Sequence, residues 1–233
     1  DRSEVKVEYT KTAESAERLK EVEVKIRPSA DSISVETDYG NWRTSSTDRW
    51  KTSGRTQVDI RLTVPRGADL NEIETVNGSI MISGTNNFAK ASAVNGTVRA
   101  NNISGRIRLS TVNGEVNAEL ERLETRSSVT LETVNGRVLV SLPSDSNATI
   151  KADSVNGTIA NDFGLPVRRG RYVGRDLHGR IGTGEVQVRL SSVNGTLTVN
   201  RRKDGRTPGQ IVNLLPPVGS DDVSTGPSPA MVD

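Results

Sequence analysis

Apolar and polar residues alternate in short stretches along most of the chain, and one tripeptide punctuates the pattern. Val-Asn-Gly occurs six times, and a Val, Ile or Leu follows two residues after each glycine. The asparagines of these copies are Asn77, Asn95, Asn113, Asn135, Asn156 and Asn194. Repeats of about 20 residues are typical of solenoids and repeat arrays, so the pattern predicts a repeat protein.

The spacing of the copies points to one further, drifted copy. Successive asparagines are 18, 18, 22, 21 and 38 residues apart, and the last interval is roughly twice the others. Inside it, Leu177 to Ile181 keeps an apolar-x-Gly-x-apolar frame, with His178 where asparagine usually stands. We therefore predict His178 at the same corner position as the asparagines.

A single repeat predicts its own local structure. Val112 and Val116 lie four positions apart, so both would face one side of an extended strand, and we expect both in the core. Asn-Gly between them adopts positive φ at little steric cost, which predicts a corner. A second motif, Ile-Ser-Gly at 82–84 and 103–105, recurs about half a repeat away from the Val-Asn-Gly copies. It predicts a second corner, and hence two short strands in each coil.

Asn-Gly is also the usual signal of a β-hairpin, so an antiparallel meander is the alternative architecture. The regular repetition favours a parallel stack, because coils about 4.8 Å apart place identical residues directly over one another. We predict an all-β chain, a parallel β-solenoid (β-helix or β-roll) of about 18–22 residues per coil. A β-rich N-terminal cap is expected to cover one end.

The asparagines allow two interpretations, a ladder that binds sugars or ions and a purely structural corner ladder. The structural interpretation is favoured, because stacked amides can bond to the copies above and below. In that case Asn→Ala at a middle copy destabilises the fold. The calcium-binding nonapeptide of β-rolls does not occur in the sequence.

Residues 1–70 lack the repeat and are expected to form a β-rich capping region. Strands are predicted at 5–9, 22–26, 32–37 and 57–64, with a short helix over 12–19 that Thr12 could cap. Trp42 and Trp50 lie in a polar stretch between strands. They could form a binding platform, or they could cover the end of the solenoid, which is the favoured interpretation.

The solenoid is predicted over residues 71–200, followed by a Pro/Gly/Ser-rich tail over 201–233. A basic loop near Tyr172 could meet an anionic surface or simply be solvated; its arginines are Arg168, Arg169 and Arg171. In the tail, Ile211, Leu214 and Leu215 could add a strand to an exposed edge, either of the chain's own solenoid or of a neighbour. A homo-oligomer or a protein partner of the cell envelope is the expected consequence.

Composition narrows the function classes. The 233 residues carry 31 basic and 29 acidic side chains, a net charge of +2 that does not call for nucleic acid. No apolar run is long enough to span a bilayer. The sequence starts at Asp1 without methionine, which favours removal of an upstream segment such as a secretory signal. The absence of cysteine leaves the compartment open.

These residues resemble the bacterial putative-adhesin, β-strand-repeat family of unknown function. The resemblance rests on Leu-Thr-Val-Pro at 62–65, on the Thr-Val-Asn-Gly units, on Leu-Pro at 142–143 and on Gly-Thr-Gly-Glu-Val at 182–186. It covers about residues 1–200. It implies a right-handed β-solenoid in an exported protein, periplasmic, cell-surface or extracellular, and it implies no catalytic residues.

A non-catalytic role is therefore predicted, in adhesion or the binding of surface polymers such as glycans. The outward threonines and arginines are expected to form one polar face; they are Thr75, Thr97, Thr111, Thr133, Thr158, Thr196, Arg99, Arg106, Arg108 and Arg137. The alternative is a structural subunit that assembles through its tail. A polysaccharide-active enzyme is the third hypothesis, although no spacing selects a pair among Glu115, Asp153, Asp162, Asp176 and Glu185. No cofactor or metal site is expected.

Overall fold

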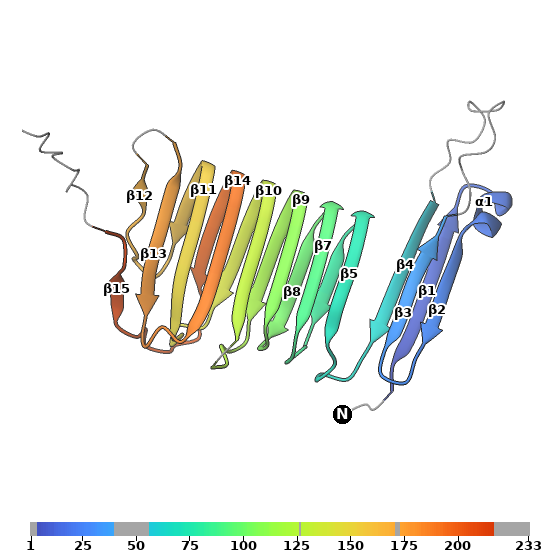
Figure 1. Cartoon of the computed structure of the whole chain (residues 1–233), viewed down its shortest axis with the longest axis horizontal. Coiled ribbons are helices and arrows are strands. Elements are labelled where there is room, and N and C mark those ends of the chain that lie inside the picture. The colour runs from blue at the N-terminus through green and yellow to red at the C-terminus, as the bar shows by residue number, and fades with distance from the viewer. Residues whose placement is uncertain (1–3, 40–55, 126, 171–172, 217–233) are drawn as a thin grey trace, which may run out of the picture. The chain divides into compact units, whose positions relative to one another are not determined.

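The computed structural model describes residues 4–39, 56–125, 127–170 and 173–216. The chain forms two units, residues 1–65 and 66–233, each with its own internal contacts. The strands of the second unit stand side by side in one long row (Figure 1). The first strand of the second unit begins at Leu70.

The first unit consists of two antiparallel strand pairs and one helix. Its elements are β1 (Lys6–Ala13), α1 (Ala16–Glu21), β2 (Glu23–Pro28), β3 (Ile33–Asp38) and β4 (Thr56–Thr63). β1 pairs with β4 over its whole length, and β2 pairs with β3. All four strands fall within two residues of the predicted ones at most ends. Trp42 and Trp50 lie outside the described residues.

The helix of the first unit starts later than predicted. Thr12 still belongs to β1, and the cap of α1 is Ser15, whose hydroxyl accepts a hydrogen bond from the Arg18 N–H at 3.2 Å. Serine in an extended conformation satisfies a helix N-terminus as well as threonine does. The predicted range 12–19 was therefore wrong at its start, because the alternation of β1 continues to Ala13.

The second unit contains the repeats. Its strands are β5 (Leu70–Asn77), β6 (Ile80–Ser83), β7 (Ala89–Asn95), β8 (Val98–Ile103), β9 (Ile107–Leu120), β10 (Ser128–Leu142), β11 (Ala148–Asn161), β12 (Arg168–Arg169), β13 (Arg175–Ile181), β14 (Val186–Arg201) and β15 (Ile211–Asn213). Successive repeats pair in parallel with identical positions opposite each other, as Asn95 does with Asn113. The predicted parallel, in-register arrangement is confirmed, and the fold is a mostly parallel, β-solenoid-like stack.

Each repeat folds back on itself at Asn-Gly, which creates two layers. We call the strand segments before this corner the first layer and those after it the second layer. In β9, Ile107 and Leu109 point inward before the corner, while Val116 and Ala118 point inward after it; all four are essentially buried. The aliphatic core lies between the layers, and its burial is the main driving force for stacking.

The corner reverses one sequence-based expectation. Val112 is 40% exposed, whereas Val116 is fully buried. Before the corner the last inward residue is Thr111, not Val112. The strict alternation of a strand is interrupted by the bend, so that Thr111 and Val116, five positions apart, both face the core. The prediction that both valines of each repeat are buried was wrong for this reason.

The last repeat enters the stack out of sequence. β14 pairs with β10 on one side, with Asn194 opposite Asn135, and with β11 on the other, with Asn194 opposite Asn156. β14 accordingly lies between β10 and β11 in Figure 1. The order of the strands in the stack therefore departs from their order along the chain.

The predicted drifted copy does not take part in the corner. β13 runs antiparallel to β11, and His178 lies opposite Lys151 instead of beside an asparagine. A Cβ on Gly179 would lie 2.3 Å from Cδ2 of Leu165, so this glycine receives a core side chain rather than another glycine. Phe163 and Leu165 are buried with the core, which ends here.

The segment after β14 returns to the stack and is fastened to it. The Ser144 hydroxyl donates to the Arg202 carbonyl at 2.7 Å, and Arg206 Nη1 lies 3.1 Å from Asp145 Oδ1. Hydrogen bonds from Ser144 and from the Arg206 N–H lower the pKa of Asp204 to about 2. β15 then pairs antiparallel with β13 of the same chain.

Candidate functional site

Six asparagine side chains form a continuous hydrogen-bonded ladder along the corner. Five hydrogen bonds join them: from Asn95 onward, each amide nitrogen donates to the Oδ1 of the asparagine that precedes it in the ladder, at distances from 2.8 to 3.1 Å. The order of the ladder is Asn77, Asn95, Asn113, Asn135, Asn194 and Asn156. Since each internal amide both donates and accepts within the ladder, this row is suited to holding the coils in register.

The backbones approach one another closely beneath this ladder. A Cβ on Gly136 would lie 1.8 Å from the carbonyl oxygen of Gly114, and one on Gly195 would lie 1.6 Å from that of Gly136. No side-chain Cβ fits at such distances, and the obstructing atoms belong to the backbone. Glycine is therefore required at this position by the approach of the neighbouring coil.

The corner also presents an exposed apolar row, which we call the valine ridge. Its members are Val76, Val94, Val112, Val134, Val155 and Val193, and their exposed fractions run from 40% to 63%. They occupy equivalent positions on strands that pair in register. The ridge places apolar surface directly beside the polar amide ladder.

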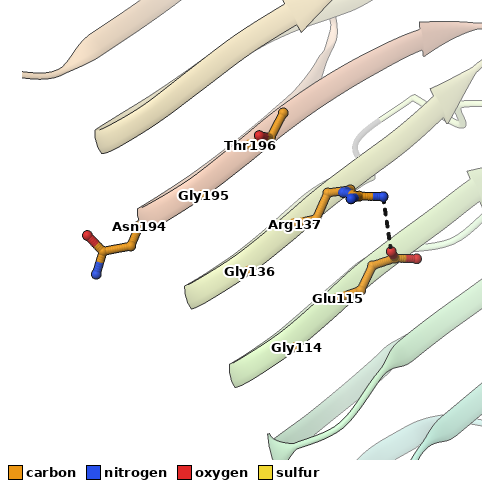
Figure 2. A pocket seen from close by; sticks show the side chains of 7 residues that line it. All are labelled: Gly114, Glu115, Gly136, Arg137, Asn194, Gly195 and Thr196. Carbon is orange, nitrogen blue, oxygen red and sulfur yellow. Dashed lines mark ion pairs between the residues drawn. The ribbon is translucent and has the colours of Figure 1, made fainter.

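A shallow hollow of about 440 Å³ lies just past the ladder, across β9, β10 and β14 (Figure 2). Its charged lining residues are Glu115 and Arg137, whose Oε2 and Nη1 atoms lie 3.9 Å apart. Arg99 lies 3.4 Å from the other carboxylate oxygen of Glu115. Glu115 thus lies between two guanidinium groups, and its ion pairs leave one positive charge in excess. An open surface of this kind suits an extended partner better than a small molecule that must be enclosed.

A second hollow of about 470 Å³ lies where the valine ridge meets the β12–β13 hairpin. Asp153 and Asp176 both line it and lie directly opposite each other on β11 and β13. Asp176 is held by Arg168 through contacts of 2.9 and 3.2 Å. Among the described residues, the buried hydroxyls of Thr133 and Ser192 at this hollow have no hydrogen-bond partner.

The outward threonines and arginines do not form one face. Thr111 and Thr133 are buried on the inner side of the corner. Thr97 and Arg99 belong to the second layer, whereas Arg106 directly precedes β9 and Arg108 is its second residue, in the first layer. The single polar face that the sequence predicted is therefore wrong, because the bend distributes these residues over two layers and the interior.

The remaining predicted binding residues are separated. Arg168 is engaged by Asp176, Arg169 is exposed, and Arg171 lies outside the described residues. Ile211 and Leu214 are 41% and 37% exposed, and Leu215 is half-buried. Ile211 lies opposite Ile181 in the β13–β15 pair, so this part of the tail adds a strand to its own chain.

Sequence reasoning missed two outward cations, Lys151 and Arg189. The structure places them directly opposite each other on β11 and β14. Each lies five residues before its asparagine, Asn156 or Asn194, and Arg108 stands in the same relation to Asn113. Superposing the repeats on their asparagines would have revealed this recurring cation.

Over the described ranges, no group of three or more histidine, cysteine, aspartate or glutamate side chains could hold a metal ion. Within the same ranges, no helix has the length and apolarity needed to cross a membrane.

Residues 9–200 match the model of a family described as Toastrack DUF4097. The chain belongs to this toastrack family. The resemblance of its repeats to bacterial putative-adhesin proteins is thereby confirmed. Among curated proteins, none matches this toastrack chain in sequence.

One solved structure that the chain resembles is that of a putative cell adhesion protein from Clostridium sporogenes ATCC 15579. The two chains are 14% identical, and the TM-score is 0.47. The matched region covers 84% of the toastrack chain and 82% of the other chain.

Proposed function

We propose that this chain is a non-catalytic protein of the cell envelope or extracellular space that binds surface polymers in adhesion. The observation that carries the proposal is the continuous run of in-register strands, whose outward residues repeat along the stack. A polymer with its own repeat can contact equivalent positions on successive coils. The toastrack match over residues 9–200 includes all six Val-Asn-Gly copies, so the repeating surface belongs to the part of the chain that defines the family.

An exported location and a right-handed winding of the coils are part of the same proposal. About 98% of crossover connections between parallel strands of one sheet are right-handed, which supports the winding. Protease digestion of intact and lysed cells tests the location. We expect the protein to be cleaved in intact cells or after release of the periplasm, and protection until the cytoplasm opens would contradict it.

Binding to envelope polymers can be tested by co-sedimentation of the purified protein with insoluble envelope material. We expect the folded protein to sediment with the material and to leave the polymer chains uncut. A release of reducing ends would identify a polysaccharide-active enzyme instead. The hollow at Asp153 and Asp176 is the place where substitution should then abolish turnover.

The competing proposal is a structural subunit, and β15 is the feature that favours it. Because β15 is only three residues long and lies at the end of the stack, exchange between copies could link chains. Light scattering after size-exclusion chromatography of the full chain and of a chain lacking residues 205–233 distinguishes the two. A stable monomer in both cases supports the polymer binder, and large assemblies lost on truncation support the subunit.

A further inference from the structure

A band of cations crosses the outer surface of the first layer. Arg108 lies opposite Thr130, Thr130 opposite Arg189, and Arg189 opposite Lys151. Arg180 lies opposite Thr149, two residues before Lys151, and Arg106 lies two residues before Arg108. All five cations are exposed. We call Arg106, Arg108, Lys151, Arg180 and Arg189 the basic band.

The basic band carries charge that no ion pair neutralises in the described structure, in contrast to Lys90, the next cation of the row opposite Arg108, which is paired with Glu72 at 3.1 Å. Over the described residues, none of the five makes a side-chain hydrogen bond or an ion pair. Two acidic residues on this surface, Glu132 and Asp153, flank Ser191, two residues nearer the corner than Arg189. They lie in the row next to the band and form no ion pair with it in the described structure.

The second layer provides a direct contrast. There Arg99 and Arg137 both face Glu115, at 3.4 and 3.9 Å. Each of these two cations has a carboxylate partner, although the two share it. On the first layer, Arg189 and Lys151 are instead like charges in directly opposed positions, an arrangement that destabilises a sheet.

The fold does not require cations at these positions. Thr130 occupies the same row as Arg108 and Arg189, and Gln187 and Thr149 occupy the row of Arg106 and Arg180. Neutral residues thus serve equally well in adjacent coils. Cations without an ion pair, at positions where the fold accepts neutral residues, remain available to an external anion.

The direction and shape of the basic band indicate which class of anion it could bind. The row runs across the strands, so its charges follow the axis of the stack at steps of about 4.8 Å or a multiple. This geometry suits a linear polymer with an anion on each repeating unit, laid along the axis. The band is a sheet surface without aromatic side chains, and it offers neither a stacking platform for bases nor an element that enters a DNA groove.

We infer that the basic band binds a linear anionic polysaccharide through carboxylate or phosphate groups spaced along the polymer. This inference deepens the proposed function and rests on it, by naming the charge class of the surface polymer. Arginine and lysine bind such anions through charge-assisted hydrogen bonds, which salt weakens at an exposed surface.

The test compares two double variants that change net charge equally. Arg189→Gln with Lys151→Gln removes adjacent cations of the band, and Arg99→Gln with Arg137→Gln is the matched control on the second layer. Polygalacturonate serves as the anionic probe and dextran as the neutral one, with binding followed by affinity electrophoresis. Both variants should retain the circular dichroism spectrum of the wild type and melt close to it, because all four residues are on the surface and such changes have small effects on stability.

The wild type is expected to bind polygalacturonate, and rising salt should weaken the complex. The band variant should bind about tenfold more weakly, and the control should change by less than about twofold. Equal losses in the two variants, or equal binding of dextran, would overturn the inference while leaving polymer binding intact. Failure to bind either probe or envelope material would overturn the proposed function as well. A preference for duplex DNA over polygalacturonate in competition would overturn the choice of polysaccharide.

Discussion

The Val-Asn-Gly corner and the basic band both repeat residues from coil to coil, but for different physical reasons. At the corner, a Cβ on Gly136 would collide with the Gly114 carbonyl, so the backbone itself demands glycine. In the band, Thr130 stands in the same row as Arg108, and the strand pairing continues unchanged. The corner glycines therefore repeat because the fold requires them. We attribute the repeated cations of the band, which form no ion pair, to a binding partner outside the protein.

The largest effect should come from adding a methyl group at the corner. Gly136→Ala places a Cβ about where a backbone oxygen lies, and the neighbouring coil has to shift. We expect a loss of roughly 3 kcal/mol or more in the free energy of unfolding, or no folded protein. Gly67→Ala is the matched control, since no atom lies within 4 Å of its added Cβ. Urea unfolding measures both, and equal stability of the two variants would show that the coils do not approach so closely.

The two valines of one repeat should differ in the next largest effect. Val138 is fully buried, whereas Val134 on the valine ridge is 40% exposed. Val138→Ala should cost about 2 kcal/mol through lost burial and the cavity left behind. Val134→Ala should cost less than about 0.5 kcal/mol. Thermal unfolding of both variants provides the measurement, and similar losses would mean that the ridge is covered in the folded protein.

The asparagine ladder should contribute a smaller amount. Asn135→Ala removes two amide hydrogen bonds, to Asn113 at 2.9 Å and from Asn194 at 2.8 Å. Because the ladder is exposed to water, we expect a loss of about 1 kcal/mol. Asn117→Ala, on the outer surface of the neighbouring strand β9, should be nearly neutral. Chemical denaturation would contradict the structural role if both variants matched the wild type.

The smallest effect should be found in the band, and its sign should be opposite. Arg189→Gln relieves repulsion with the directly opposed Lys151. We expect the free energy of unfolding to rise by about 0.3 kcal/mol at low salt and the gain to shrink as salt is added. Denaturation at two salt concentrations tests this. A clear loss of stability would show that the fold does require the cation, as it requires the corner glycines.

Much of the solenoid could be predicted because its determinants are local. The Asn-Gly pair predicts a bend, and the spacing of about 20 residues between copies predicts stacked coils. The identity of the residues in successive copies predicts parallel pairing in register. The same local reasoning failed for Val112. The rule that every second residue faces the same side holds only for a straight strand, and the chain bends between Val112 and Val116. It placed Thr111 outside for the same reason.

The order of the strands could not be predicted from the repeats alone. Asn194 is equally suited to pair with Asn135 or Asn156, and in the structure it pairs with both. The order coincides with a reversal at β13, which runs antiparallel to β11 and where Leu165 lies against Gly179. Such a contact joins segments that no repeat pattern relates. The basic band depends on this order, because it is the insertion of β14 that brings Arg189 beside Lys151.

The insertion of β14 between β10 and β11 is the central structural claim, and the lack of cysteine in the chain allows a direct test. Arg137 on β10 lies opposite Thr196 on β14, and Thr196 lies opposite Thr158 on β11. Neighbouring strands about 4.8 Å apart permit a disulfide, whereas strands two steps apart do not.

The measurement is the extent of disulfide formation under mild oxidation in two double-cysteine variants of the whole chain. Arg137→Cys with Thr196→Cys should cross-link readily within one chain, and Arg137→Cys with Thr158→Cys should remain reduced. The reverse result, with residues 137 and 158 joined and 137 and 196 not, would show sequential stacking and contradict the insertion of β14.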